Sequence, residues 1–156
     1  MKSRILRVLA AFMLVTGLAV TAPQPAQAAC GYACDGKDAA AYGCGSTITA
    51  LEKPIIATTY VTGKIELRYS QTCRTVWARI QIWKADYEKG AISWAKAQVI
   101  RTSDNKVMGC TNLAWSNVTG SYTCYTPMLN DAGLTSFANA QVYYYNAHLY
   151  AETGLY

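Results

Sequence analysis

Six cysteines offer the most constrained chemistry in this sequence of 156 residues: Cys30, Cys34, Cys44, Cys73, Cys110 and Cys124. An even number of cysteines in a short chain with an N-terminal export signal is typical of disulfides, which persist outside the reducing cytosol. Cys110 and Cys124 flank a predicted hairpin whose turn contains Asn117 and Gly120, so we expect these two cysteines to pair. The other four have three possible pairings, and their spacing leaves all three open.

Zinc binding is the alternative use of clustered cysteines. A structural zinc site needs close pairs of cysteines that converge on four ligands. Cys30 and Cys34 form the only close pair, and the single histidine, His148, lies more than a hundred residues further along the chain. The sequence therefore favours three disulfides, and it predicts no metal site and no cofactor.

His148 is also the residue on which a Ser-His-Asp mechanism would depend. It stands in a tyrosine-rich run, where a strand would place it on one face with Tyr144, Asn146 and Tyr150. No nucleophile-elbow motif accompanies it, and oxidised cysteines provide no thiol nucleophile. We therefore interpret His148 as packed among tyrosines, assign no catalytic residue and predict a protein without enzymatic activity.

Two carboxylates in the cysteine-rich segment, Asp35 and Asp38, form the best candidate pair for binding calcium. Oxygen ligands suit calcium, but a dedicated site normally uses more than two carboxylates. Aspartate is also common in turns, where its side chain accepts hydrogen bonds from backbone N–H groups. We therefore expect Asp35 and Asp38 to be turn residues.

Aromatic and cationic side chains alternate on the predicted strands. Trp77, Arg79 and Trp83 project from one strand, Arg68 projects from its neighbour, and Trp94 begins a similar run further on. Arginine planes stack on tryptophan rings, and such cross-strand pairs contribute about 0.2–1 kcal/mol each to a sheet. The same residue types dominate the energetics of binding interfaces. These five residues are therefore either a structural ladder or a candidate binding face.

An antiparallel sheet would position these side chains. Apolar and polar residues alternate over residues 65–70 and 75–83, and the short polar link between these runs predicts a hairpin. Residues 92–101 end in Val99 and Ile100 just before a polar turn, which favours a strand over a helix.

Further strands are expected at residues 55–61, 122–128 and 142–150. Turn signals recur at fairly even spacing between segments rich in β-branched and aromatic residues. We therefore predict an all-β fold, a small disulfide-stapled antiparallel β-sandwich or barrel. A loop-rich lead-in over residues 29–60 precedes its regular strands.

The N-terminus carries part of the net charge of +5. Lys2, Arg4 and Arg7 precede an apolar run that is too short to span a membrane, and residues 26–28 resemble a signal-peptidase cleavage site. We expect residues 1–28 to be a signal peptide and residues 29–156 to be a single secreted β domain without a transmembrane span. Eleven basic and nine acidic residues remain in that domain, and this near balance argues against nucleic-acid binding.

Several segments, in this order, resemble one known family. They are Cys34-Asp35-Gly36-Lys37-Asp38, Gly43-Cys44, Glu66-Leu67-Arg68-Tyr69-Ser70, Cys73 and Trp77-Ala78-Arg79-Ile80. The series resembles the YjfA-like family of small secreted bacterial (mainly actinobacterial) proteins, a domain of unknown function. The resemblance covers residues 30–80 and extends loosely beyond them, and Ala39 stands where the family usually has proline. It implies a bacterial, extracellular, disulfide-containing β domain, and it implies no activity.

Three function classes fit this sequence. The first is a secreted non-enzymatic interaction module that binds other extracellular proteins, for example by adding a strand to a free sheet edge. The second is a module that binds cell-wall glycans through exposed tryptophan and tyrosine, and the third is a small hydrolase centred on His148. We expect the protein-binding module, because the sequence contains no recognisable catalytic constellation and no linker to a catalytic domain.

Overall fold

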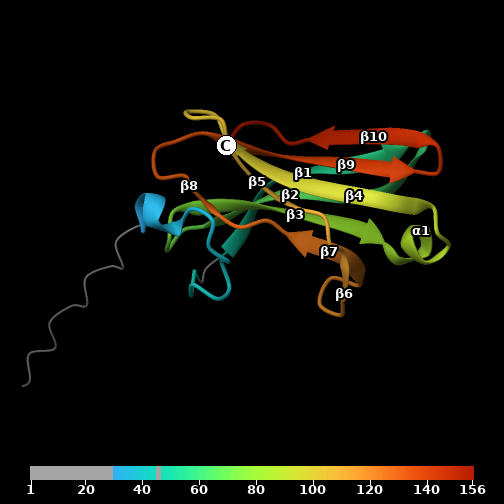
Figure 1. Ribbon diagram of the computed structural model, residues 1–156, viewed down its shortest axis with the longest axis horizontal. Coiled ribbons are helices and arrows are strands. Elements are labelled where there is room, and N and C mark those ends of the chain that lie inside the picture. Colours follow the sequence, from blue (N-terminus) through green and yellow to red (C-terminus); the bar gives the residue numbers. More distant parts are fainter. Residues whose placement is uncertain (1–29, 45–46) are drawn as a thin grey trace, which may run out of the picture.

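The computed structural model describes residues 30–44 and 47–156, so the predicted signal peptide lies outside the described residues. Within these ranges, two antiparallel sheets pack face to face (Figure 1). The first sheet contains β1 (Thr47–Ala57), β2 (Tyr60–Ser70), β3 (Thr75–Trp83), β6 (Ala114–Ser116), β7 (Ser121–Tyr125) and β8 (Leu129–Asn130). The second contains β4 (Ile92–Arg101), β5 (Lys106–Cys110), β9 (Ser136–Tyr144) and β10 (Ala147–Glu152). A 3-10 turn (Gly31–Cys34) precedes β1, and a short helix, α1 (Lys84–Glu88), links β3 to β4.

The strand order explains how the chain connects the two sheets. The first sheet has the order β1-β2-β3-β7-β6, and β8 pairs with the start of β3. The second has the order β10-β9-β4-β5. The chain leaves the first sheet through α1, forms β4 and β5, and then returns to complete the first sheet before it ends in the β9–β10 hairpin. Among the described residues, no helix combines the length and hydropathy that a membrane crossing requires.

Alternating side chains build the core between the sheets. In β2 and β3 the fully buried apolar residues are Ile65, Leu67, Val76, Ala78, Ile80 and Ile82. The facing strands β4 and β9 contribute Ala95, Ala97, Val99, Ala138, Ala140 and Val142. Bulky aliphatic residues of one sheet thus pack against a surface of the other in which alanine predominates. The predicted all-β, disulfide-stapled antiparallel fold is confirmed, and of the two expected forms it is the sandwich. The loop-rich lead-in predicted over residues 29–60 is too long, because the strand β1 occupies much of it.

The hairpin predicted from residues 65–70 and 75–83 is confirmed as the β2–β3 pair. Its register places Arg68 opposite Trp77 and Glu66 opposite Arg79, on the face that points away from the core. The strand predicted at residues 92–101 is also confirmed, as β4.

Two other predicted strands are wrong because they run across turns. Residues 55–61 contain the β1–β2 turn, where Thr58 has a φ of 57°, and residues 142–150 contain the β9–β10 turn, where Tyr145 has a φ of 49°. Both segments are rich in β-branched or aromatic residues, so their composition does not mark the turn. The strand predicted at residues 122–128 ends at Tyr125, shortly before Pro127, whose nitrogen cannot donate a ladder hydrogen bond.

Candidate functional site

Trp77 is not exposed, contrary to its place in the predicted binding face. Its side chain is 5% exposed and packs with Cys34, Cys44 and Met128 in a second, smaller core. The segment before β1 forms this core by folding over the outer face of the first sheet. The prediction that Trp77 projects into solvent is therefore wrong, because residues distant in sequence cover it.

Arg68 and Arg79 lie around a buried carboxylate, that of Glu66, which is 1% exposed. Arg79 donates hydrogen bonds to Glu66, and so do Gln81 Nε2 at 2.9 Å and Lys64 Nζ at 2.7 Å. Burial alone would raise the pKa of Glu66, but hydrogen bonds from Arg79 and Lys64 outweigh it and lower that pKa. These cations satisfy a buried charge, as expected for a structural ladder.

Trp83 and Trp94 complete the predicted set, and they lie in different sheets. Trp83 is half-buried at the start of α1, whereas Trp94 lies in β4 of the second sheet and is 42% exposed. The five residues therefore do not form one surface. Trp94 is the member that presents its ring to solvent.

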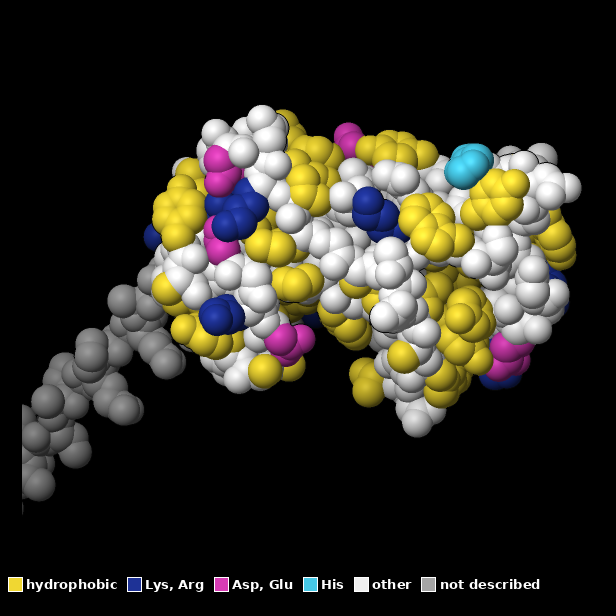
Figure 2. Space-filling view, viewed as in Figure 1, with side chains coloured by type: hydrophobic (Ala, Val, Ile, Leu, Met, Phe, Trp, Pro, Cys, Tyr) yellow, Lys and Arg dark blue, Asp and Glu magenta, His cyan; other side chains and the backbone are white. Residues whose placement is uncertain are grey.

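Around Trp94 the outer face of the second sheet carries further aromatic side chains. The register of β4, β9 and β10 places Trp94, Tyr143 and His148 in one row across the strands. Tyr150 lies in the adjacent row, about 7 Å further along β10. We call Trp94, Tyr143, His148 and Tyr150 the aromatic platform. Figure 2 looks onto this face and shows hydrophobic side chains gathered around the histidine over β9 and β10.

Polar side chains alternate with the rings of the platform. Lys96 and Gln141 share the row of Tyr150, and the next row consists of Gln98, Asn139 and Glu152. Gln141 Nε2 donates to Gln98 Oε1 at 3.5 Å, and the Tyr150 hydroxyl donates to Glu152. That hydrogen bond to a carboxylate raises the pKa of Tyr150 to about 12, so the hydroxyl stays protonated at neutral pH. The face thus offers aromatic rings, amides and one charge of each sign.

His148 lies on this platform in a different setting from the predicted one. It shares its face with Tyr143 and Tyr150, whereas Tyr144 points into the core and Asn146 lies in the β9–β10 turn. The His148 and Tyr143 rings are 4.7 Å apart between centroids. The predicted packing of His148 among tyrosines agrees with this ring contact. The prediction that His148 shares a face with Tyr144 is wrong, because the chain turns between these two residues.

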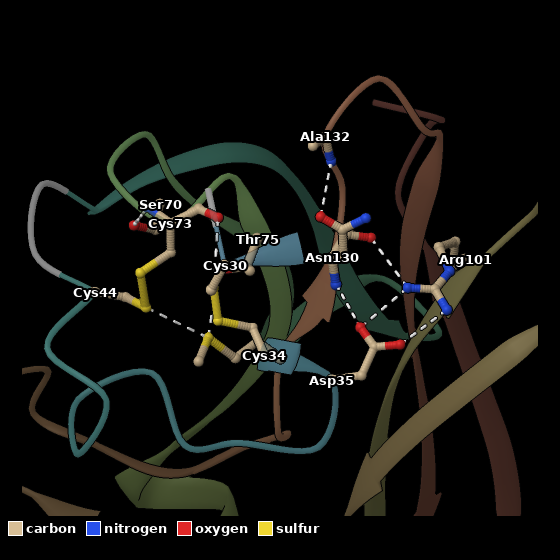
Figure 3. Close-up of a disulfide and its surroundings, with 11 residues drawn as sticks. Cys30, Cys34, Asp35, Cys44, Ser70, Cys73, Thr75, Arg101, Asn130 and Ala132 are labelled. Carbon is tan, nitrogen blue, oxygen red and sulfur yellow. Dashed lines mark hydrogen bonds and ion pairs between the residues drawn. A yellow bond between two sulfur atoms is a disulfide. The ribbon is translucent and has the colours of Figure 1, made fainter. Parts of the chain in front are cut away.

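Asp35 and Asp38 do not act as a pair. Asp35 accepts hydrogen bonds from the fully buried guanidinium of Arg101 at 2.9 and 3.0 Å, and one from the Asn130 backbone N–H (Figure 3). Burial would raise the pKa of Asp35, but these donors lower it. Asp35 therefore anchors the N-terminal segment to β4 and β8.

Asp38, in contrast, is exposed and borders a groove of about 700 Å³. Trp115 and Tyr125 from the β6–β7 hairpin line this groove, together with Asn112 and the Cys110–Cys124 disulfide. In Figure 2 the surface is hollowed between the N-terminal segment and this hairpin. Asp38 has no ionic partner among the described residues.

The cysteines form the disulfides Cys30–Cys34, Cys44–Cys73 and Cys110–Cys124. The predicted Cys110–Cys124 pair is confirmed, and it joins β5 of one sheet to β7 of the other. The other two disulfides select one of the three open pairings (Figure 3). Cys44–Cys73 ties the N-terminal segment to the turn between β2 and β3, whereas Cys30–Cys34 closes a small loop within that segment. The sulfur atoms of Cys30, Cys34 and Cys73 lie within 4.8 Å of one another, and each of them belongs to a disulfide.

Sequence reasoning placed Tyr150 on the face of His148, but it missed Tyr143 and Gln141 on that face, and Trp115 and Tyr125 at the groove. The alternation of Asn139, Gln141 and Tyr143 with small apolar residues was a signal that these side chains share one outward face. The pairing of β9 with both β4 and β10, which creates the platform, has no local signal.

The comparisons with known proteins agree on one family. A family model described as a protein of unknown function (DUF2690) matches residues 32–139. The uncharacterized protein YjfA of Bacillus subtilis (strain 168) is 32% identical over 133 residues, which cover 80% of this chain and 81% of that protein. No solved structure matches the chain.

Proposed function

Since the chain belongs to the DUF2690 family, whose function is unknown, we propose from its own surface that it is an exported, non-enzymatic module that binds glycans. One observation carries the proposal. Trp94, Tyr143 and Tyr150 lie on one sheet face with amide side chains between them. The predicted signal peptide and the three disulfides support an extracellular location.

The chemistry of the platform suits a sugar chain. The C–H faces of a pyranose ring are apolar and pack on aromatic rings, while its hydroxyl groups need both donors and acceptors. Gln98 and Gln141 supply both from their amides. Lys96 and Glu152 balance each other in charge, so the face has no preference for a strongly anionic polymer.

A glycan fits this face better than the protein partner expected from the sequence. Protein interfaces concentrate apolar side chains at the centre and polar ones at the rim. Here polar and aromatic residues alternate across the whole face. Strand addition also lacks a regular template at β1, the long edge strand of the first sheet, because β1 contains Pro54 and two register shifts.

Binding without hydrolysis is the activity that these groups support. Glycoside hydrolysis commonly uses two carboxyl groups that flank the scissile bond. Beside the platform this face has one carboxylate, that of Glu152, which already accepts a hydrogen bond from the Tyr150 hydroxyl. The His148 ring contacts the Tyr143 ring in a tilted arrangement and adds ring surface to the platform.

The proposal is tested by titrating the purified exported protein with soluble fragments of cell-wall polysaccharides and chitin. Trp94→Ala and Tyr150→Ala should each weaken binding about tenfold, as the loss of a central aromatic contact does at other interfaces. Tyr42→Ala is the matched control, because Tyr42 is 49% exposed and lies in the N-terminal segment. Equal affinity of all four proteins, or binding of no glycan, would contradict the proposal.

A further inference from the structure

The groove beside Asp38 has chemistry that the platform lacks. Asp38 is the charged residue among the described residues that line the groove. Its carboxylate accepts the backbone N–H of Ala41 at 2.8 Å, and no cation of the described chain forms an ion pair with it. An exposed carboxylate between aromatic side chains is a favourable setting for a ligand cation.

We propose that this groove binds the free ammonium group of a de-N-acetylated amino sugar. The inference rests on the proposed glycan binding and names the class of sugar at a second subsite. Trp115 and Tyr125 are 40% and 45% exposed and supply the ring faces. A smaller cavity of about 170 Å³ adjoins the groove through Asp38 and Tyr125, and it is also lined by Trp77.

The protein's own cations nearest the two rings each have an acidic partner. Arg79 lies 5.8 Å from the centre of the Tyr125 ring, and Lys84 lies 5.8 Å from that of Trp115. Arg79 is paired with Glu66, and Lys84 is paired with Glu88 one helical turn away. The negative charge of Asp38 is therefore the one left available to a ligand in this groove.

The groove is held in shape before any ligand binds. Cys110–Cys124 forms part of its wall. Backbone hydrogen bonds fasten the Asp38 segment, with Gly36 N–H donating to Met128 O and Met128 N–H donating to Lys37 O, both at 2.9 Å. Trp115 Nε1 donates to Asn117 Oδ1 at 2.7 Å, which fixes the indole ring. Such preorganisation lowers the entropy lost on binding.

Position and size favour a sugar over a metal ion. A single carboxylate is too few for a calcium site, whereas about 700 Å³ lies within the range of small-molecule sites. Gly109 connects the groove to the platform, because it lines the groove and pairs with Gln98 of β4. One glycan chain can therefore lie across the platform and end in the groove.

The four tryptophans allow the two subsites to be followed separately. Their indole N–H signals are recorded by ¹H–¹⁵N NMR of the exported protein and assigned with single Trp→Phe variants. The probes are the hexamers of glucosamine and N-acetylglucosamine at low salt. We expect both probes to shift the Trp94 signal, and the glucosamine hexamer alone to shift the Trp115 signal.

The decisive variant is Asp38→Asn, with Glu52→Gln as the matched control outside the groove. Asp38→Asn should weaken glucosamine-hexamer binding about threefold to tenfold and leave the acetylated hexamer unaffected. Equal weakening of both probes, or a Trp115 shift with both, would overturn the ammonium site. Binding of oligolysine that depends on Asp38, with no binding of the glucosamine hexamer, would also overturn the ammonium site. A Trp94 shift without any Trp115 shift removes this inference alone, whereas no Trp94 shift with either probe removes the proposed function.

Discussion

Replacing Trp77 by alanine should destabilise the protein and leave binding of the N-acetylglucosamine hexamer, which should contact the platform alone, unchanged in the folded protein. The indole is 5% exposed and packs against Cys34, Cys44 and Met128. Truncating a buried tryptophan costs about 3–5 kcal/mol, and the cost rises with the cavity that remains. Disulfides hold the segment above Trp77, so the site has little freedom to collapse. We therefore expect the upper part of this range, with a fall in Tm of about 10–20 °C.

Trp94→Ala provides the matched comparison, because it makes the same chemical change at a side chain that is 42% exposed. It should change the free energy of unfolding by less than about 1 kcal/mol while it weakens glycan binding. Urea unfolding of each variant at pH 7, with glycan titration below the transition, separates the two effects. A Trp77→Ala protein that unfolds like the wild type but loses binding would refute the distinction between core and platform.

Three further predictions concern the scaffold. Glu66→Gln should lower the free energy of unfolding by about 2–4 kcal/mol in urea at pH 7, because Arg79 and Lys64 lose their buried counter-charge; an unchanged midpoint would contradict this. Burial raises the pKa of the Asp131 carboxyl group to about 6, above the ordinary 3.8. Its protonated form therefore stabilises the folded protein fully below about pH 4, and this contribution to the free energy of unfolding is lost as the pH rises through 6. The free energy of unfolding of Asp131→Asn should therefore rise by about 2–3 kcal/mol relative to that of the wild type between pH 4 and pH 7. A difference between the two proteins that stays constant with pH would exclude this linkage. Replacing both Cys110 and Cys124 by serine should lower the free energy of unfolding by about 2–4 kcal/mol, as measured by thermal unfolding. An unchanged value would show that packing alone holds the two sheets together.

Local patterns predicted the parts of the fold that local physics decides. The period-2 alternation around Glu66 and Arg79 determines which side of the β2–β3 hairpin faces the core. Cys110 and Cys124 could be paired because they flank a short hairpin. The strand at β4 followed from its β-branched end and the turn after it.

The candidate site depends on contacts between distant segments, which local patterns do not encode. Trp77 alternates as a solvent-facing residue would, and it is buried because residues 30–44 fold over it. Asp38 becomes the carboxylate of a groove because the same segment lies near Tyr125, far away in the sequence. The tyrosine-rich segment looks like one strand because the turn at Tyr145 contains no glycine or proline to mark it.

The most direct test of glycan binding is capture of the tagged protein from producer culture, with supernatant and cell-wall fractions treated in parallel and analysed by mass spectrometry. We expect retention on wall material, release by soluble sugar fragments, and loss of retention in Trp94→Ala but not in Tyr42→Ala. A stoichiometric protein companion that survives moderate salt, together with sugar-insensitive retention, would contradict it.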